Sequence, residues 1–119
     1  MYPIIHFKNT QSDFIEKVEL AGFSLSTKEF DNCCILHDGS IIFVEQMSYH
    51  SHISFSGKCV TKKKSFFNTP CNSTNFSIFL ISKADMFAID LLNINQVCEK
   101  GIIIEIGTED LVILPFIHN

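Results

Sequence analysis

The sequence predicts an α+β fold, in which two strand–helix–meander (βαβββ-like) units form a mixed, cupped sheet with two helices. Two stretches place apolar residues at the spacing of a helix face, and each ends near a glycine, Gly22 or Gly101. Short apolar runs separated by turn-forming residues follow each stretch, as is typical of strands. The second unit is degenerate, because it has one strand fewer after its helix.

The first unit begins with "PIIHFK", whose side chains alternate as those of a strand do. Phe14, Val18 and Ala21 recur at helical spacing, which predicts a helix over residues 11–21. Gly22 is placed to end this helix in a left-handed conformation. We therefore expect the first strand to cross over, through the helix, into a strand meander.

Three short strands of this meander follow the predicted helix. The stretch "FSLS" alternates apolar and polar residues, which is typical of a strand with one solvated face. The stretch "CCIL" is apolar throughout and predicts a strand buried on both faces, with Cys33 and Cys34 pointing to opposite sides. Asp38-Gly39 is a strong hairpin signal and leads into the return strand "IIFVEQ".

The second half begins with a predicted strand, "HISFSGKCV", and a loop at residues 61–75 that is rich in turn formers. A further strand, "FSIFLIS", comes next. Apolar residues from Met86 to Val97 at helical spacing predict a helix over about residues 84–98, closed by Gly101. The stretches "IIIEIG" and "LVILPFI" predict a last hairpin.

The chain has 119 residues, within the usual range of one domain, so we predict a single domain over residues 1–119. We divide it into a first unit (1–46), a strand with an irregular loop (47–75) and a shorter second unit (76–119). Hydrophobic residues make up 46% of the chain and charged residues only 18%. So much apolar side chain in a small domain favours burial against a second copy, and we predict a homodimer.

Charge and cysteine content bear on partners and compartment. The net charge of −4 and the lack of a basic stripe argue against nucleic-acid binding. The chain shows no signal-peptide pattern and no apolar run near the ~18 residues that span a bilayer, so we expect no membrane partner. Five cysteines without a C-x-x-C motif suggest reduced thiols rather than disulfides or zinc ligands. We therefore predict a cytoplasmic protein.

Several short motifs resemble those of the vicinal oxygen chelate superfamily, and most closely its bleomycin-resistance branch. They are "YPIIHFKN" before a helix, Gly22-Phe23 at the helix end, and "CCILHDGSIIFVEQ" after it. The likeness covers Tyr2 to Gln46, and Asn75 to Gly101 more weakly. The chain departs from the pattern where "EKVEL" replaces an aromatic pair, and it lacks the family's acidic turn before the last strand. The resemblance implies two βαβββ units and a cleft between subunits.

The resemblance leaves two kinds of function open. Non-metal members sequester a ligand without chemistry, whereas catalytic members hold a divalent ion that polarises substrate oxygens. We predict no metal and no cofactor. The alternative is a lyase, transferase or dioxygenase with a divalent ion on His6, His52 and Glu105, with Glu45 and His50 as further candidates.

A cysteine nucleophile is a weaker alternative. Cys59 or Cys71 could pair with His50 or His52 as its base. Nothing in the spacing of these residues brings them together.

We predict a non-catalytic binding protein that sequesters a small or medium-sized ligand. The second alternative is a small protein–protein interaction module or inhibitor encoded by a virus or mobile element. The expected contact surface combines the stretch "MSYHSH" with the loop at residues 61–75, because binding residues often lie on loops. Its predicted binding residues are Tyr49, His50, His52, Lys63, Phe66 and Phe67.

Overall fold

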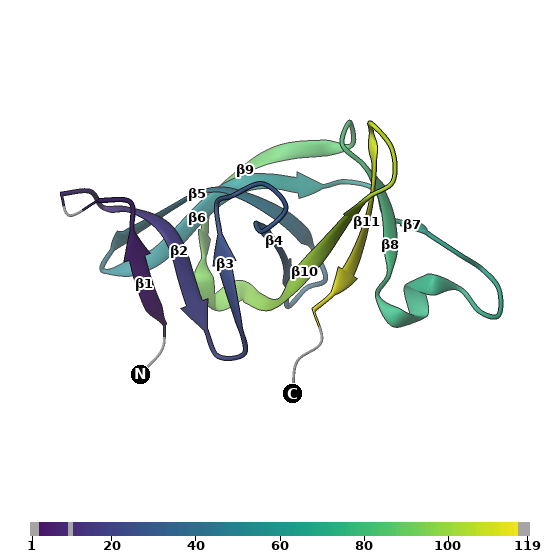
Figure 1. Cartoon of the computed structure of the whole chain (residues 1–119), viewed down its shortest axis with the longest axis horizontal. Coiled ribbons are helices and arrows are strands. Elements are labelled where there is room, and N and C mark those ends of the chain that lie inside the picture. Colours follow the sequence, from purple (N-terminus) through teal and green to yellow (C-terminus); the bar gives the residue numbers. More distant parts are fainter. Residues whose placement is uncertain (1–2, 10, 117–119) are drawn as a thin grey trace.

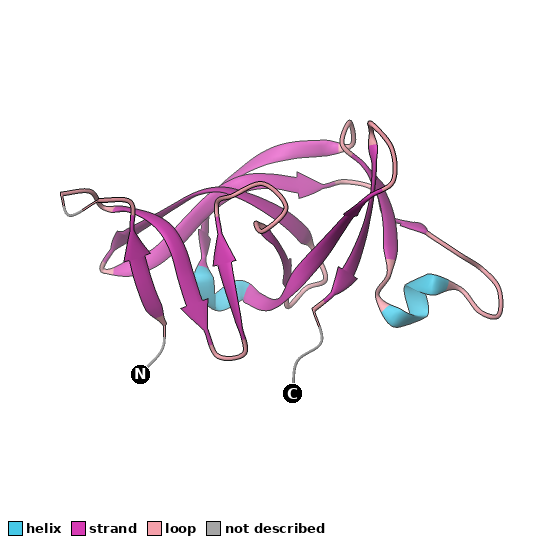
Figure 2. Cartoon of the chain, viewed as in Figure 1, coloured by secondary structure: helices cyan, strands magenta, loops and turns pink. Residues whose placement is uncertain are grey.

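The computed structural model describes residues 3–9 and 11–116, and this part of the chain contains strands and two 3-10 turns but no α-helix (Figures 1 and 2). The predicted α+β fold with two helices is therefore wrong. Tyr2, before the first predicted strand, and Ile117, in the last one, lie outside the described residues. Within the described residues, no helix has the length and apolar character needed to cross a membrane.

Within residues 3–9 and 11–116, eleven strands join in one antiparallel sheet. They are β1 (Ile4–Phe7), β2 (Phe14–Leu20), β3 (Phe23–Ser26), β4 (Cys33–Leu36), β5 (Ile41–His50), β6 (His52–Val60), β7 (Lys64–Ser65), β8 (Phe79–Ser82), β9 (Met86–Asn93), β10 (Val97–Glu105) and β11 (Asp110–Pro115). The 3-10 turns are η1 (Ser73–Phe76) and η2 (Ile94–Gln96). The main path runs β1-β2-β5-β4-β10-β11-β8-β7, while β3 pairs with β2 and β6 joins β5 to β9. The predicted segments 1–46, 47–75 and 76–119 all contribute strands to this one sheet.

The first predicted helix, over residues 11–21, is replaced by strand β2. Its pairing with β1 shifts register so that Glu16 has no residue opposite, which makes a β-bulge. The bulge brings Ile15 and Val18, three residues apart, into the same buried cluster. Buried residues three positions apart are also typical of one face of a helix. Gly22 does adopt a positive φ of 96°, but it does so in the turn of the β2–β3 hairpin.

The second predicted helix, over residues 84–98, is replaced by β9, the turn η2 and the start of β10. A register shift in the β6–β9 pairing again brings two residues three apart, Ile89 and Leu92, to one core. Gly101, expected to close this helix, lies inside β10 instead. A Cβ at Gly101 would come within 2.6 Å of the sulfur of Cys33.

The predicted three-strand meander is wrong, because β3 pairs with β2, but the hairpin predicted at Asp38-Gly39 is confirmed by strands β4 and β5. Their hairpin turns at Asp38-Gly39, and Gly39 has a φ of 89°. All four residues of β4 are buried. Cys34 packs in the larger core cluster, with residues of β2, β3, β5 and β6, whereas Cys33 packs in the smaller cluster, with residues of β8 and β11. The β4–β5 hairpin therefore separates two cores.

Strand β10 connects the two parts of the sheet. Its first residues, Val97 to Lys100, pair with β4, and its last residues, Gly101 to Glu105, pair with β11. The loop of residues 27–32, which precedes β4, lies outside the sheet, so no residue of β4 pairs with the second half of β10. This arrangement opens a cleft beside the second half of β10.

Candidate binding cleft

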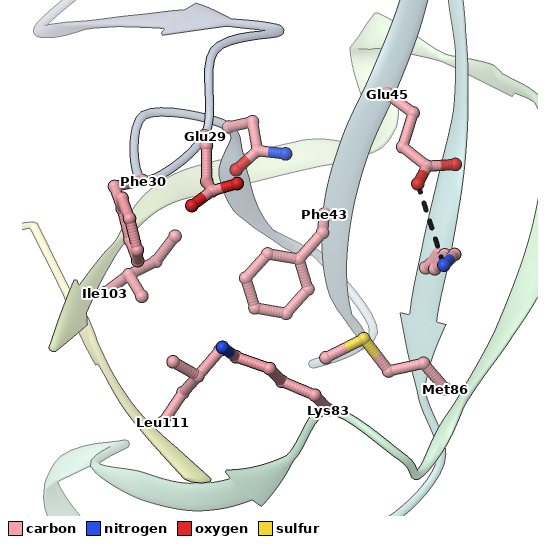
Figure 3. Close-up of a pocket in the computed structure, with 10 residues that line it drawn as sticks. Glu29, Phe30, Phe43, Glu45, Lys83, Met86, Ile103 and Leu111 are labelled. Carbon is pink, nitrogen blue, oxygen red and sulfur yellow. Dashed lines mark ion pairs between the residues drawn. The ribbon is translucent and has the colours of Figure 1, made fainter. Parts of the chain in front are cut away.

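The cleft lies over the smaller core, between the loop of residues 27–32 and strands β5, β9, β10 and β11 (Figure 3). Its volume is about 300 Å³. The lining residues come from six separate segments of the chain: Glu29, Phe30, Asn32, Phe43, Glu45, Lys58, Lys83, Met86, Ile103 and Leu111. Because these segments are hydrogen-bonded strands or loops anchored to them, the sheet fixes the shape of the cleft.

The floor of the cleft is apolar. The ring of Phe43 lies at its centre, with Met86 on one side and Ile103 and Phe30 on the other (Figure 3). Phe43, Met86 and Ile103 are only partly buried and pack against the smaller core. Leu111 belongs to that core and is 4% exposed. The floor is thus an extension of the core that remains open to a ligand.

Charged side chains surround this floor. The Nζ atom of Lys58 lies 3.9 Å from a carboxylate oxygen of Glu45, and that of Lys83 lies 3.1 Å from Glu105. Glu29 makes no hydrogen bond or ion pair with any residue that the structure describes, and Figure 3 shows its carboxylate at the cleft rim. The rim therefore holds one carboxylate whose charge is not balanced locally.

A second cavity, of about 460 Å³, adjoins the first. Both cavities include Phe30 and Ile103 in their linings. The second cavity also includes Ile102, whose side chain lies on the opposite face of β10 from that of Ile103, together with the aromatic residues Phe23 and Phe116. The two cavities therefore meet at Phe30 and Ile103, and the second also reaches Ile102 on the opposite face of β10.

Phe30 lies between the two cavities in an unusual conformation. Its φ is 68°, and 47% of the residue is exposed. A bulky residue with positive φ is a conformational outlier, and such strain is concentrated at functional sites. The loop is held in place at Asp31, which accepts a hydrogen bond from Ser26 Oγ at 2.8 Å and pairs with Lys100. At Asn32, the side-chain amide donates to the carbonyl of Val44 at 2.7 Å.

Three of the predicted binding residues lie at the tip of the β5–β6 hairpin. His50 and His52 face each other across the turn, where Ser51 has a φ of 67°. His50 Nδ1 lies 3.8 Å from Asp13, and Tyr49 packs edge-on against Phe7. None of these residues lines the cleft.

Of the other three predicted binding residues, Phe66 and Phe67 directly follow β7 and Lys63 directly precedes it, and β7 lies at the other end of the molecule from the β5–β6 hairpin (Figure 1). Lys63 donates to the carbonyl of Gly39 and lies over the ring of Phe79. Phe66 and Phe67 meet edge-on, 6.4 Å between ring centres. The structure therefore divides the predicted contact surface into two distant parts, and a role for either part stays a prediction.

The segment that follows Phe66 is an ordered loop. Ser73 is fully buried, and its hydroxyl accepts hydrogen bonds from the backbone N–H groups of Phe66 (2.7 Å) and Phe67 (3.2 Å). The same hydroxyl donates to the carbonyl of Ile78 at 3.0 Å. One serine thus fixes both ends of the loop, a role that its position in a polar stretch did not reveal.

The alternative metal ligands are not brought together. His6 pairs with Glu19 at 2.6 Å, His52 contacts Ser51, and Glu105 pairs with Lys83. Over residues 3–9 and 11–116, no three His, Cys, Asp or Glu side chains are placed to share a metal ion.

The cysteine–histidine alternative is not assembled either. Cys59 and His52 occupy the two ends of β6, which at about 3.3 Å per residue places them roughly 20 Å apart. Cys71 lies in the loop beyond β7, at the other end of the molecule from the histidine hairpin (Figure 1). His50 faces His52 at the hairpin tip, so neither cysteine lies within reach of either histidine for proton transfer.

The fold and the cleft define an all-β protein with an open, apolar cavity whose rim carries charge. The chain belongs to the family described as Domain of unknown function (DUF8592), whose model matches residues 3–116. Comparison with curated proteins and with solved structures finds no match. The family match provides no link to the vicinal oxygen chelate superfamily, whose strand–helix units the fold also lacks.

Proposed function

We propose that the protein is a non-catalytic binding protein and that its ligand occupies the cleft above Phe43. The observation that supports this proposal is the convergence of apolar side chains from four strands on one open cavity, where Phe43, Met86, Ile103 and Leu111 meet. An apolar cavity with a few charged groups at its rim is the usual form of a ligand site. The cleft provides apolar contact and orientation for a bound molecule.

The charges favour a ligand that has an apolar body and a positive group. Glu29 has no partner within the described residues, and Glu45 is held only loosely by Lys58, at 3.9 Å. A cationic group on the ligand would neutralise Glu29 while the apolar body covers Phe43. The net charge of −4 also favours the approach of a cation.

We also propose that the protein acts in the cytoplasm and forms homodimers. All five cysteines are free thiols, which is usual in a reducing compartment. Large apolar side chains remain exposed on several strands, which favours a second copy as partner.

Titration with benzylammonium tests the proposed ligand site, with benzyl alcohol as the neutral probe of the same shape. We expect benzylammonium to shift the NMR signals of the Met86 and Ile103 methyl groups in a saturable way. Glu29→Gln should weaken benzylammonium binding about threefold to tenfold, because one charge pair is lost. Its effect on benzyl alcohol should be small. Glu109→Gln is the matched control, since Glu109 does not line the cleft.

Absence of any shift at the Met86 and Ile103 methyl groups with both probes would overturn the proposed ligand site. Shifts confined to other regions, such as Tyr49 or Phe66, would overturn it equally.

A further inference from the structure

The second half of β10 is paired with a strand on only one side, although β3 comes close to β10 without pairing. Its residues from Gly101 to Glu105 pair with β11, and no described strand pairs with their other edge. Strand β4 ends its contact with β10 near Gly101, because the chain turns away at Cys33 into the loop of residues 27–32. The open edge therefore borders both cavities at Ile103.

The hydrogen bonds at the ends of the β10–β11 pair show which way its main-chain groups point. The N–H of Phe116 donates to the carbonyl of Lys100 at 2.8 Å, and the N–H of Ile106 donates to the carbonyl of Asp110 at 3.2 Å. In an antiparallel pair, alternate residues exchange hydrogen bonds with the partner strand. The main-chain N–H and C=O groups of the even-numbered residues of β10 therefore point toward β11. Those of Ile103 and Glu105 point toward the open edge.

Free main-chain donors and acceptors on an edge are the groups that an added strand would bind. The two cavities suit the side chains of such a strand, because successive side chains of an extended peptide point to opposite faces. One cavity lies on the face of Ile103 and the other includes Ile102 on the opposite face. The edge and the cavities together therefore form a site for one extended chain.

The charges indicate the sequence that this strand would have. In the first cavity, Phe43 and Met86 can cover the aliphatic stem of a lysine or arginine while Glu29 pairs with its charged end. In the second cavity, Lys100 and Asp31 already pair with each other, and the rings of Phe23 and Phe116 favour an apolar side chain.

We propose that the cleft binds an extended peptide segment of a partner protein, which alternates apolar and basic residues and adds as a strand to the open edge of β10. This proposal rests on the proposed function and specifies the class of ligand. Phe30, held at φ 68° between the two cavities, would separate the side chains of successive peptide residues.

A short blocked peptide that alternates valine and lysine is the probe that tests strand addition. The matched control peptide has the same side chains but carries N-methyl groups on the amides that would face β10. We expect the unmethylated peptide to bind and to slow hydrogen exchange at the amides of Ile103 and Glu105. The methylated peptide should bind at least about tenfold more weakly, which corresponds to about 1.4 kcal/mol.

The other outcomes separate this inference from the proposed function. Equal binding of both peptides, or binding of benzylammonium without either peptide, would overturn strand addition and leave the ligand site standing. Failure of the peptides and of benzylammonium alike would overturn both. Glu29→Gln should weaken binding of the valine–lysine peptide but not binding of a valine–glutamine peptide, whereas Glu109→Gln should change the binding of neither. Equal effects of the two variants on binding would contradict the assignment of Glu29.

Discussion

At the scale of single residues, the close approach of two strands depends on Gly57. This residue of β6 pairs with Val44 of β5, next to the β-bulge at Glu45 where the register shifts. A Cβ at Gly57 would lie 2.0 Å from the carbonyl oxygen of Phe43, and main-chain atoms cannot move aside as a flexible side chain can. Gly57 therefore keeps β5, and with it the cleft floor, against β6.

Gly57→Ala should lower the free energy of unfolding by about 3 kcal/mol, because the strands must separate to make room. Gly107→Ala is the control, since a Cβ there would meet no atom within 4 Å. Its effect should stay within about 0.5 kcal/mol. Urea denaturation measures both values, and similar effects of the two substitutions would contradict this account of Gly57.

Asp31 makes stability depend on pH in the acid range. Burial opposes its ionisation, but hydrogen bonds from Lys100 and Ser26 outweigh burial and hold the pKa of Asp31 below its usual value. A carboxyl group whose pKa is lower in the folded state than in the unfolded state stabilises the folded state. This contribution is complete when the pH is above the pKa of the unfolded state, about 3.9 for an aspartate. That contribution is lost as the pH falls through the lower, folded pKa.

Asp31→Asn should therefore destabilise the protein at neutral pH and have less effect as the pH falls below about 4. Denaturant unfolding of both proteins across the acid range measures this difference. A destabilisation that is the same at every pH would show that Asp31 acts through neutral hydrogen bonds alone.

At the scale of elements, the open edge of β10 can be tested without a ligand. We expect the amides of Ile103 and Glu105 to exchange with solvent much faster than those of Ile102 and Ile104, because only the latter bond to β11. Hydrogen exchange followed by NMR resolves the four amides. Equal protection of all four would show that the edge is already covered.

The loop that follows β7 provides a second prediction for an element. Ser73→Ala would leave the N–H groups of Phe66 and Phe67 without their acceptor, at a cost of about 1–3 kcal/mol. Asn75→Ala is the control in the same turn, since the Asn75 side chain is exposed. Thermal unfolding compares the variants. A loss no greater than that of the control would show that the loop does not depend on Ser73.

The sequence predicts some elements and conceals others for a definable reason. Asp38-Gly39 sets a hairpin by local backbone preference alone, and Cys33 and Cys34 face opposite cores because strand side chains alternate. Both misassigned helices include a strand with a bulge, β2 at Glu16 and β9 near Asp90. A bulge depends on the partner strand, so the i, i+3 spacing that it creates cannot be distinguished from helical spacing in one sequence.

The cleft was equally hidden, because its parts come from distant segments. Phe43 stood out only as a member of a predicted strand, and Glu45 only as a further candidate metal ligand. Phe30 carried no signal, since nothing in the sequence indicates a positive φ at a phenylalanine. The loops that did stand out, around His50 and Phe66, lie at opposite ends of the molecule (Figure 1). Their separation depends on long-range strand pairing, which local patterns do not contain.

At the scale of the whole molecule, self-association remains a prediction with a specific route. Strand β9 pairs only with β6 among the described strands, and Phe87 on it is 49% exposed. A long apolar edge favours pairing with another chain, and a lysine on the edge opposes it. Sedimentation should show a mass above that of the monomer, 13.5 kDa, at high concentration.

Phe87→Lys should shift this equilibrium toward the monomer, whereas Phe76→Lys, on an exposed residue of η1, should not. A clean monomer at high concentration would contradict self-association. Equal effects of the two substitutions would contradict β9 as the contact.

The crystal structure of the protein with the blocked valine–lysine peptide tests the central claim most directly. We expect the peptide to lie along β10 between the two cavities, with main-chain hydrogen bonds to Ile103 and a lysine side chain near Glu29. A peptide bound instead at the hairpin of His50 and His52, or on the loop of Phe66, would contradict the assignment of this cleft as the binding site.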